Sequence, residues 1–258
     1  MLLEGKKALV FGVANDMSNA WGIARAFHEQ GAVVGFSSIE GLIDKRVRPL
    51  AKQLDSTFVE PCDVQDDDQI RTVFEKWEAE HGSLDVLVHS LAFAPKEDLD
   101  GAFIDTSRDG FRLALDVSAY SLVALAREAR RVMGRGSSIM TLTYYGAEKV
   151  VSNYRVMGIA KAALEACVRY LAAELGPQGI RVNAISPGPV RTLAAHGVSG
   201  FKSMYRKFPD LAPLRSTITI EDVGRSALYL ASDLSSAVTG EIIYADGGFN
   251  ILGVPAEE

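Results

Sequence analysis

The chain has 258 residues, of which 48% are hydrophobic and 23% charged, and its formal net charge is −6. This balance is typical of a globular protein with a substantial core, and the negative charge disfavours a nucleic-acid binder because phosphate backbones attract basic surfaces. No apolar run is long enough to span a membrane, and the N-terminus lacks the layout of a signal peptide, so we expect a cytoplasmic protein. Two cysteines and four histidines are scattered without ligand or disulfide spacing, so we expect no metal.

Short β-branched runs alternate along the chain with segments whose apolar residues recur every three or four positions. The runs predicted as strands are residues 6–12, 32–37, 57–61, 84–90, 137–143, 180–186 and 240–246. The clearest helical patterns cover residues 18–30, 67–81 and 153–175. This alternation predicts one α/β domain over residues 1–258, a doubly wound Rossmann-type parallel sheet of seven strands with helices on both faces. In such a fold, ligands bind beyond the carboxyl ends of the strands.

The first predicted strand is followed by a glycine-bearing loop and a helix start. Gly12 permits a tight turn, and Ser18 is a candidate N-cap for the helix that begins at Asn19. Ala20 and Gly22 are small enough to let this helix approach the sheet or a pyrophosphate, which the N–H groups of a helix start would favour. The spacing differs from G-x-G-x-x-G, so an ordinary turn between strand and helix stays open as the alternative.

Further strand ends offer contacts for a nucleotide. Glu40 follows the second strand, where a carboxylate would bind an adenosine ribose diol and favour NAD(H) over NADP(H), or it is a solvated loop residue. Asp63 follows the third strand and would contact an adenine edge, with a helix cap as the alternative. Residues 90–92 follow the fourth strand, in position to lie against a ribose or a nicotinamide.

Tyr154 and Lys161 are seven positions apart on the helix predicted over residues 153–175. At about 100° per residue, this spacing returns to within about 20° of the same face, so the two side chains would share a face of the helix. Met157 stands four positions before the lysine, and a methionine has no proton to give. Tyr144 follows the preceding strand and would lie beside the pair. On spacing alone, surface or packing residues remain an alternative.

Over its whole length, the sequence resembles the enoyl-acyl-carrier-protein reductases of bacterial type II fatty-acid synthesis, a branch of the short-chain dehydrogenase/reductase superfamily. Most of the superfamily has Y-x-x-x-K with an upstream serine, whereas this branch has Y-x6-K with an upstream tyrosine, the arrangement of Tyr144, Tyr154 and Lys161. The segments that carry the resemblance include GVANDMSNAWGIA (12–24), DVLVHSLAFAP (85–95), SSIMTLTYYGAEKVVSNYRVMGIAKAALEACVRYLAAELG (137–176) and RVNAISPGPVRTLAA (181–195).

The resemblance implies reduction of the trans-2 double bond of an enoyl thioester on acyl carrier protein by hydride transfer from NADH, the last step of the elongation cycle. Tyr154 would hydrogen-bond the enolate oxygen, Lys161 would hold the nicotinamide ribose and lower the pKa of the phenol, and Tyr144 would line the pocket beside the thioester. The implied cofactor contacts are Gly12, Ser18, Asn19, Ile39, Asp63, Val64, Ser90, Leu91, Ala92, Leu142, Lys161, Ile185, Pro187, Gly188, Val190 and Thr192. The implied substrate contacts are Phe93, Tyr144, Tyr154, Met157, Ala194, Ala195, Phe201 and Met204.

Residues 192–210 mix small, apolar and basic side chains and are expected to form a lid over the substrate. On this segment Lys202, Arg206 and Lys207 would meet the acidic carrier protein, or they belong to a solvated amphipathic helix. The resemblance also implies a homotetramer, with residues 240–254 packed between subunits.

Two rival functions and one rival residue remain. A β-ketoacyl reductase on the same fold would have Y-x-x-x-K, but here Met157 stands where that motif has its tyrosine. A catalytically silent NAD-binding protein would not need an intact Tyr154–Lys161 pair. Within the favoured function, Tyr145 doubles the tyrosine beside Tyr144 and could exchange roles with it.

Overall fold

The computed structural model describes residues 1–197 and 199–253, except for the side chains of Ala194 and His196. In this part of the chain, the sheet has seven strands, all paired in parallel, in the order β3-β2-β1-β4-β5-β6-β7. The predicted doubly wound fold is therefore confirmed. The strands are β1 (Lys7–Phe11), β2 (Val33–Ser38), β3 (Val59–Pro61), β4 (Leu84–His89), β5 (Met133–Leu142), β6 (Arg181–Pro187) and β7 (Ile242–Ala245).

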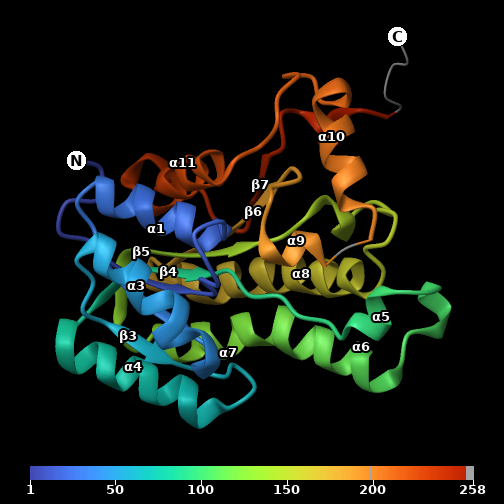
Figure 1. The fold of residues 1–258 in the computed structure, drawn as a ribbon. Helices are drawn as coiled ribbons and strands as arrows, with labels where there is room; N and C mark the ends of the chain where they lie inside the picture. The colour runs from blue at the N-terminus through green and yellow to red at the C-terminus, as the bar shows by residue number, and fades with distance from the viewer. Residues whose placement is uncertain (198, 254–258) are drawn as a thin grey trace.

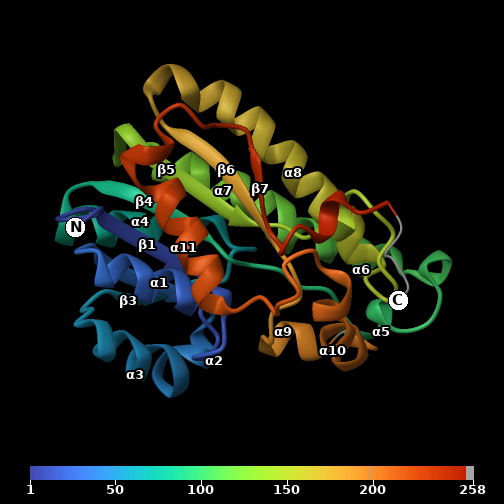
Figure 2. The ribbon, with the colours of Figure 1, turned by 90° about the horizontal axis from the view of Figure 1, so that it is seen from above.

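Helices cover both faces of the sheet and form a three-layer molecule (Figure 1). One face carries α1 (Asn19–Glu29), α3 (Arg48–Ala51) and α11 (Ile220–Ala231), and the other carries α4 (Asp67–His81), α7 (Ser121–Ala129) and α8 (Val156–Leu175). The helices α5 (Lys96–Leu99), α6 (Arg108–Leu115), α9 (Leu193–His196) and α10 (Phe201–Leu211) lie towards one end of the sheet (Figure 2). No helix in the described residues is long and apolar enough to cross a membrane.

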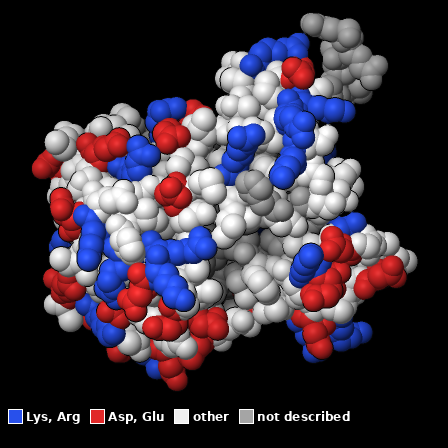
Figure 3. Space-filling model, viewed as in Figure 1, with Lys and Arg blue, Asp and Glu red and all other residues white. Residues whose placement is uncertain are grey.

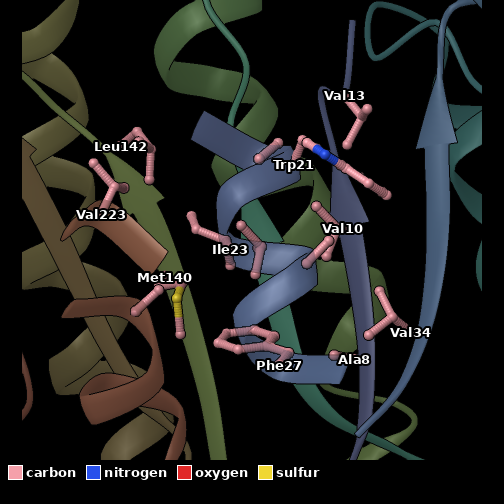
Figure 4. Close-up of a cluster of buried hydrophobic side chains, with 14 of the residues drawn as sticks. Ala8, Val10, Val13, Trp21, Ile23, Phe27, Val34, Met140, Leu142 and Val223 are labelled. Atoms are coloured by element: carbon pink, nitrogen blue, oxygen red, sulfur yellow. The ribbon is translucent and has the colours of Figure 1, made fainter. Parts of the chain in front are cut away.

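Two apolar cores lie on either side of the sheet, because side chains of a strand point alternately to its two faces. In β1, Ala8 and Val10 belong to the core under α1 and α11, whereas Leu9 and Phe11 belong to the core under α4, α7 and α8. Figure 4 shows the first core, in which Phe27 of α1 lies among strand residues that include Val10. Each fully buried side chain of this size contributes about 1.5–3 kcal/mol to folding.

The strand order reverses at β1, which pairs with β2 on one side and β4 on the other. Gly12 follows β1 with φ +100°, and a Cβ added there would lie 2.1 Å from the carbonyl oxygen of Ser90. The ends of β1 and β4 therefore meet only because residue 12 has no side chain. This crevice is the place where doubly wound sheets bind ligands.

Gly22 serves another purpose than the predicted approach to the sheet or a pyrophosphate. A Cβ added at Gly22 would lie 2.3 Å from the backbone oxygen of Ile220, and one added at Gly224 would lie 2.6 Å from the backbone oxygen of Gly22. The small residues therefore let α1 pack directly against α11, which corrects the prediction.

Candidate active site

A cavity of about 1530 Å³ opens at the carboxyl ends of the strands. Its walls come from the loops after β1 to β6, from residues 149–154, from α10 and from residues 249–253. Figure 3 shows the molecule hollowed beneath the lobe that carries α10. Ligand pockets for one small molecule usually measure about 300–1,000 Å³, so this cavity has room for an elongated cofactor together with a second molecule.

The structure places nearly all of the predicted contacts on this cavity. The predicted cofactor contacts that line it are Gly12, Ser18, Asn19, Ile39, Asp63, Val64, Ser90, Leu91, Ala92, Leu142, Lys161, Pro187, Gly188, Val190 and Thr192. The predicted substrate contacts that line it are Phe93, Tyr144, Tyr154, Met157, Ala195, Phe201 and Met204. The Ala194 side chain lies outside the described residues. Ile185 is an exception, because it lies within β6, is fully buried in the core and is not among the residues that line the cavity.

The start of α1 is arranged to receive an anion. Ser18 is the N-cap residue as predicted, but its hydroxyl accepts the N–H groups of Ala14 at 3.1 Å and Asn15 at 3.0 Å in the preceding loop. It therefore shapes the loop instead of capping the helix. The side-chain oxygen of Asn19 is buried and has no hydrogen-bond partner among the described residues. The N–H groups of a helix start suit a phosphate, whereas the unpaired amide oxygen needs a hydrogen-bond donor, such as an ordered water or a ligand hydroxyl.

The ends of β2 and β3 differ in part from the prediction. Glu40 is exposed at the start of the short helix α2 (Glu40–Leu42), whereas its neighbour Ile39 lines the cavity. Asp63 also lines the cavity. The alternative of a helix cap at Asp63 is wrong, because the carboxylate that caps α4 belongs to Asp66. The Asp63 carboxylate instead accepts the backbone N–H of Gln65 at 3.0 Å.

Tyr154 is not part of the helix that carries Lys161. Helix α8 begins at Val156, and the flanking residues Asn153 and Arg155 have positive φ values of 65° and 46°. Non-glycine residues in such conformations cost about 1–3 kcal/mol each and persist only where their surroundings hold them. The predicted reason for the pairing, a shared helical face, is therefore wrong. A strained turn places Tyr154 on the cavity that Lys161 also lines.

The two tyrosines predicted to work together pack against each other. The rings of Tyr144 and Tyr154 lie 4.9 Å apart between centroids at an angle of 66°, a favourable edge-to-face geometry. The Tyr145 hydroxyl donates to the carbonyl oxygen of Asn250 at 3.3 Å, and its ring packs against Phe249. Tyr145 is thus held by the C-terminal segment, which leaves Tyr144 as the partner of Tyr154.

Burial sets the protonation of both phenols. Burial raises the pKa of Tyr144 to about 12. It also raises the pKa of Tyr154, and the nearby Tyr144 and Glu165 act in the same direction. The net shift of this pKa is thus upward, opposite to the direction in which Lys161 is predicted to act. Both tyrosines keep their protons at neutral pH and can donate hydrogen bonds.

Lys161 is buried, with 5% of its surface exposed. Its ammonium Nζ donates to the carbonyl oxygen of Leu142 at 2.6 Å. Burial lowers the pKa of Lys161 to about 8, and the charge of Glu165 opposes this effect. The side chain is therefore mostly positive at neutral pH. Of its three N–H donors, two remain for a ligand as far as the described part of the chain is concerned.

His89 lies at the end of β4, beneath the cavity loop that starts at Ser90. It is fully buried between the hydroxyls of Thr141 at 2.7 Å and Ser121 at 2.8 Å. Burial and the charge of Lys161 lower the pKa of His89 to about 3, so the imidazole is neutral. It ties β4 to β5 and α7. Within the described residues, no cluster of three or more His, Cys, Asp or Glu could hold a metal ion.

A model of the family described as Enoyl-(Acyl carrier protein) reductase matches residues 12–250. The chain is 51% identical to the enoyl-[acyl-carrier-protein] reductase [NADH] of Aquifex aeolicus over 258 residues, which cover 100% of this chain and 96% of that protein. It is 52% identical to the Bacillus cereus protein of the same name over 254 residues, covering 98% and 99% of the two chains. The chain belongs to the enoyl-[acyl-carrier-protein] reductase family. The resemblance seen in the sequence is confirmed.

Solved structures agree with this family. The reductase superimposes with a TM-score of 0.96 on the Bacillus cereus enzyme with NADP+ and indole naphthyridinone, at 52% identity and covering 98% and 99% of the two chains. The TM-score is also 0.96 for the enzyme of Anaplasma phagocytophilum in complex with NAD, at 48% identity and covering 100% and 98%. Likeness at this level supports the same fold along the whole chain.

Sequence reasoning missed two parts of the reductase site. Residues 249–253 line the cavity, although they were expected only between subunits. Because this segment follows β7, its place beyond a strand end was a usable signal. The second part is Asn153, which lines the cavity and donates through Nδ2 to the carbonyl oxygen of Ser199 at 2.8 Å. That contact joins residues 46 positions apart, so no local sequence pattern could predict it.

Proposed function

We propose that Tyr154, Lys161 and Tyr144 are the residues of this enoyl-[acyl-carrier-protein] reductase that act on the reacting groups. The enzyme is an NADH-dependent oxidoreductase of fatty-acid synthesis that reduces the trans-2 double bond of enoyl thioesters. The observation that carries the residue assignment is the edge-to-face Tyr144–Tyr154 pair on the cavity that Lys161 also lines.

The residues around the crevice fit a dinucleotide. The cradle at Gly12 has no room for a Cβ, as expected where a pyrophosphate approaches a helix start, and the unpaired buried Asn19 amide oxygen can accept from a donor on the ligand or from an ordered water. Asp63 and Val64 would hold the adenine, and Lys161 the nicotinamide ribose. When bound, NADH supplies the hydride that adds to the β-carbon of the substrate.

Hydride addition to the β-carbon would place negative charge on the thioester oxygen, and addition of a proton to the α-carbon, from Tyr154 or through water, would then complete the reduction. The protonated phenol of Tyr154 donates a hydrogen bond to this oxygen, where a donor helps most because the charge develops in the transition state. A donor of this kind contributes about 3–4 kcal/mol to lowering the barrier. The ammonium of Lys161 adds a positive charge nearby, and Tyr144 keeps water from the face of Tyr154 on which its ring packs.

The preference for NADH over NADPH follows from the charges on the cavity. The lysines that line the cavity in the described structure are Lys149, Lys161 and Lys207. None of them lies in the segment directly after β2 or β3, where the adenosine ribose is expected. At the end of β2, the lining residue is the apolar Ile39. A 2′-phosphate on the adenosine ribose would therefore meet no cation there, while a ribose diol needs none.

The lid and the carrier-protein surface belong to the same segment. Helix α10 buries Phe201 and Phe208 towards the body and leaves Lys202, Arg206 and Lys207 exposed. Figure 3 shows basic side chains gathered over this lobe. An acidic acyl carrier protein would dock on them and deliver its thioester beneath the helix. We further propose that the enzyme works as a cytoplasmic homotetramer, which light scattering would test.

One panel of assays tests the proposed function. Oxidation of NADH is followed by nicotinamide absorbance with crotonyl and acetoacetyl thioesters in parallel, and NADPH is the second cofactor. We expect turnover of the crotonyl thioester with NADH and at least tenfold slower turnover with NADPH. Turnover of only the acetoacetyl thioester would mean that the enzyme is a carbonyl reductase. Absence of turnover with NADH bound would favour a silent binding protein.

A further inference from the structure

Glu165 is a buried carboxyl group that the reaction described above does not use. It lies on α8 with 7% of its surface exposed. Its Oε1 accepts a hydrogen bond from the Thr143 hydroxyl at 2.6 Å. Burying a carboxylate is costly unless a partner compensates, and one neutral hydroxyl compensates only in part. The position of Glu165 therefore calls for a physical explanation.

The geometry ties Glu165 to Lys161. The two residues are four positions apart on α8, so they are neighbours on one face of the helix. Two consecutive residues at the end of β5 hold them, because the Leu142 carbonyl oxygen accepts from Lys161 and the Thr143 hydroxyl donates to Glu165. No ion pair closer than 4.0 Å joins the two side chains in the described structure, so Glu165 acts on Lys161 through space.

The other groups around the pair are neutral or lie further out. His89 on β4 is a neutral imidazole, and the phenol of Tyr154 keeps its proton. On the outer side of Glu165 lie Glu148, which accepts a hydrogen bond from the Tyr244 hydroxyl, and Arg169, one turn further along α8. Burial raises the pKa of the Glu165 carboxyl, while Thr143, Arg169 and Lys161 act in the opposite direction.

We propose that Glu165 is a positioning residue that keeps Lys161 positively charged, with Thr143 holding its carboxylate in place. The inference rests on the roles proposed above for Tyr154 and Lys161. A buried negative charge stabilises a nearby ammonium, so the carboxylate of Glu165 favours the charged, donating form of Lys161. This effect favours the reaction, because the anion that forms on the thioester oxygen is stabilised by a positive charge nearby.

The first experiment measures the charge of Lys161 in the cofactor-free protein. The full chain is labelled with acetic anhydride between pH 6 and 10, and acetylation of Lys161 is followed by peptide mass spectrometry, because only the neutral amine reacts. We expect Glu165→Gln to lower the midpoint of labelling by about one pH unit or more. Glu174→Gln, which removes an exposed carboxylate from the same helix, is the matched control and should leave the midpoint unchanged.

Glu165→Asp separates the charge from the shape of the side chain. It keeps the carboxylate and should retain most of the wild-type midpoint. Glu165→Gln can still accept from the Thr143 hydroxyl, and circular dichroism checks that each variant folds. The proposal is overturned if the midpoint in Glu165→Gln equals that of the wild type, or if Glu165→Asp lowers it as far as Glu165→Gln does.

A second readout distinguishes this inference from the proposed role of Lys161. NADH binding is titrated by fluorescence over the same pH range in the wild type and in Glu165→Gln. Affinity should fall at a lower pH in the variant, in step with the labelling midpoint. A shifted labelling midpoint with an unchanged binding profile would support the action of Glu165 on Lys161 and refute Lys161 as a cofactor contact.

Discussion

Burial gives three neighbouring residues of the reductase their chemical states. It keeps the phenols of Tyr144 and Tyr154 protonated, because a phenolate would lose its hydration. The same effect lowers the pKa of Lys161 to about 8. The side chain is therefore mostly charged at neutral pH, and it loses its positive charge as the pH rises through this value. A site that stabilises a developing anion needs donors in these forms.

At the same scale, Tyr154→Phe tests the hydrogen bond to the enolate oxygen. The change removes the hydroxyl and keeps the ring that packs on Tyr144, so kcat should fall by about 10²- to 10³-fold, with little effect on NADH binding. Steady-state kinetics with a crotonyl thioester measure the loss. Tyr145→Phe is the matched control, because its hydroxyl donates to Asn250. An equal loss in both variants would contradict the assignment.

At the scale of elements, the contacts between helices and turns decide where the site residues stand. Helix α1 reaches its position because Gly22 and Gly224 allow it to touch α11. The strained turn before α8 is fastened on two sides. Arg155 donates to the carbonyl oxygen of Leu99 in α5, and Asn153 donates to that of Ser199, just before α10. Tyr154 is thereby fixed between two segments that border the cavity.

Gly22→Ala tests the contact between α1 and α11. The added Cβ would stand 2.3 Å from a backbone oxygen, which cannot move as a flexible side chain could, so we expect a loss of about 1–3 kcal/mol in the free energy of unfolding. Gly41→Ala is the control, since a Cβ there meets nothing within 4 Å and alanine favours a helix. Urea denaturation followed by circular dichroism compares the two, and equal midpoints would show that the helices can separate at little cost.

Asn153 tests the link between the turn and the lid. Asn153→Gly loses the hydrogen bond to Ser199, but glycine tolerates the positive φ of 65° at this position. Asn153→Ala loses the same hydrogen bond, and its side chain is also strained at this φ. If the hydrogen bond holds the lid, both variants should raise the KM for the enoyl thioester several-fold and speed proteolysis within residues 199–211. If only Asn153→Ala has these effects, backbone strain at the turn is the cause, and the link plays no part.

At the scale of the whole molecule, the parallel sheet brings the carboxyl ends of its strands to one edge. The cavity of about 1530 Å³ forms there, with the carboxyl-terminal residues 249–253 and helix α10 as its outer walls. The chain as a whole is acidic, with a net charge of −6, yet the lobe above the cavity exposes basic side chains (Figure 3). An acidic partner is therefore repelled by much of the surface and attracted to the entrance.

Charge reversal on α10 tests this docking surface. Changing Lys202, Arg206 and Lys207 to Glu should raise the KM for an enoyl thioester on acyl carrier protein at least tenfold. The KM for a crotonyl thioester of N-acetylcysteamine, which has no carrier protein, should stay within twofold. The control reverses Lys45, Arg46 and Lys52, which are exposed and lie before β3, and carries the same change in net charge. Similar effects of the two triple variants on the carrier-protein substrate would contradict a specific surface.

The sequence by itself determined the order of the elements, the fold class and most of the residues at the strand ends. These features follow from local hydrophobic periodicity and from the rule that parallel strands end at one edge. The family resemblance also predicted Tyr154 and Lys161 as site residues, and both line the cavity. The pattern predicted that the helix begins at residue 153, but α8 begins at Val156. The sequence did not reveal this, because Asn153 and Arg155 are held in a non-helical turn by contacts with distant segments.

Only the tertiary structure decided the protonation of the tyrosines, the partners of Gly22 and the place of residues 249–253. Each of these depends on groups far apart in the chain. The pKa of Tyr154 depends on how much water the folded protein excludes, which no local pattern reports. The role proposed for Glu165 also depends on the packing of β5 against α8, because its hydroxyl partner Thr143 directly follows the strand and its lysine neighbour lies on the helix.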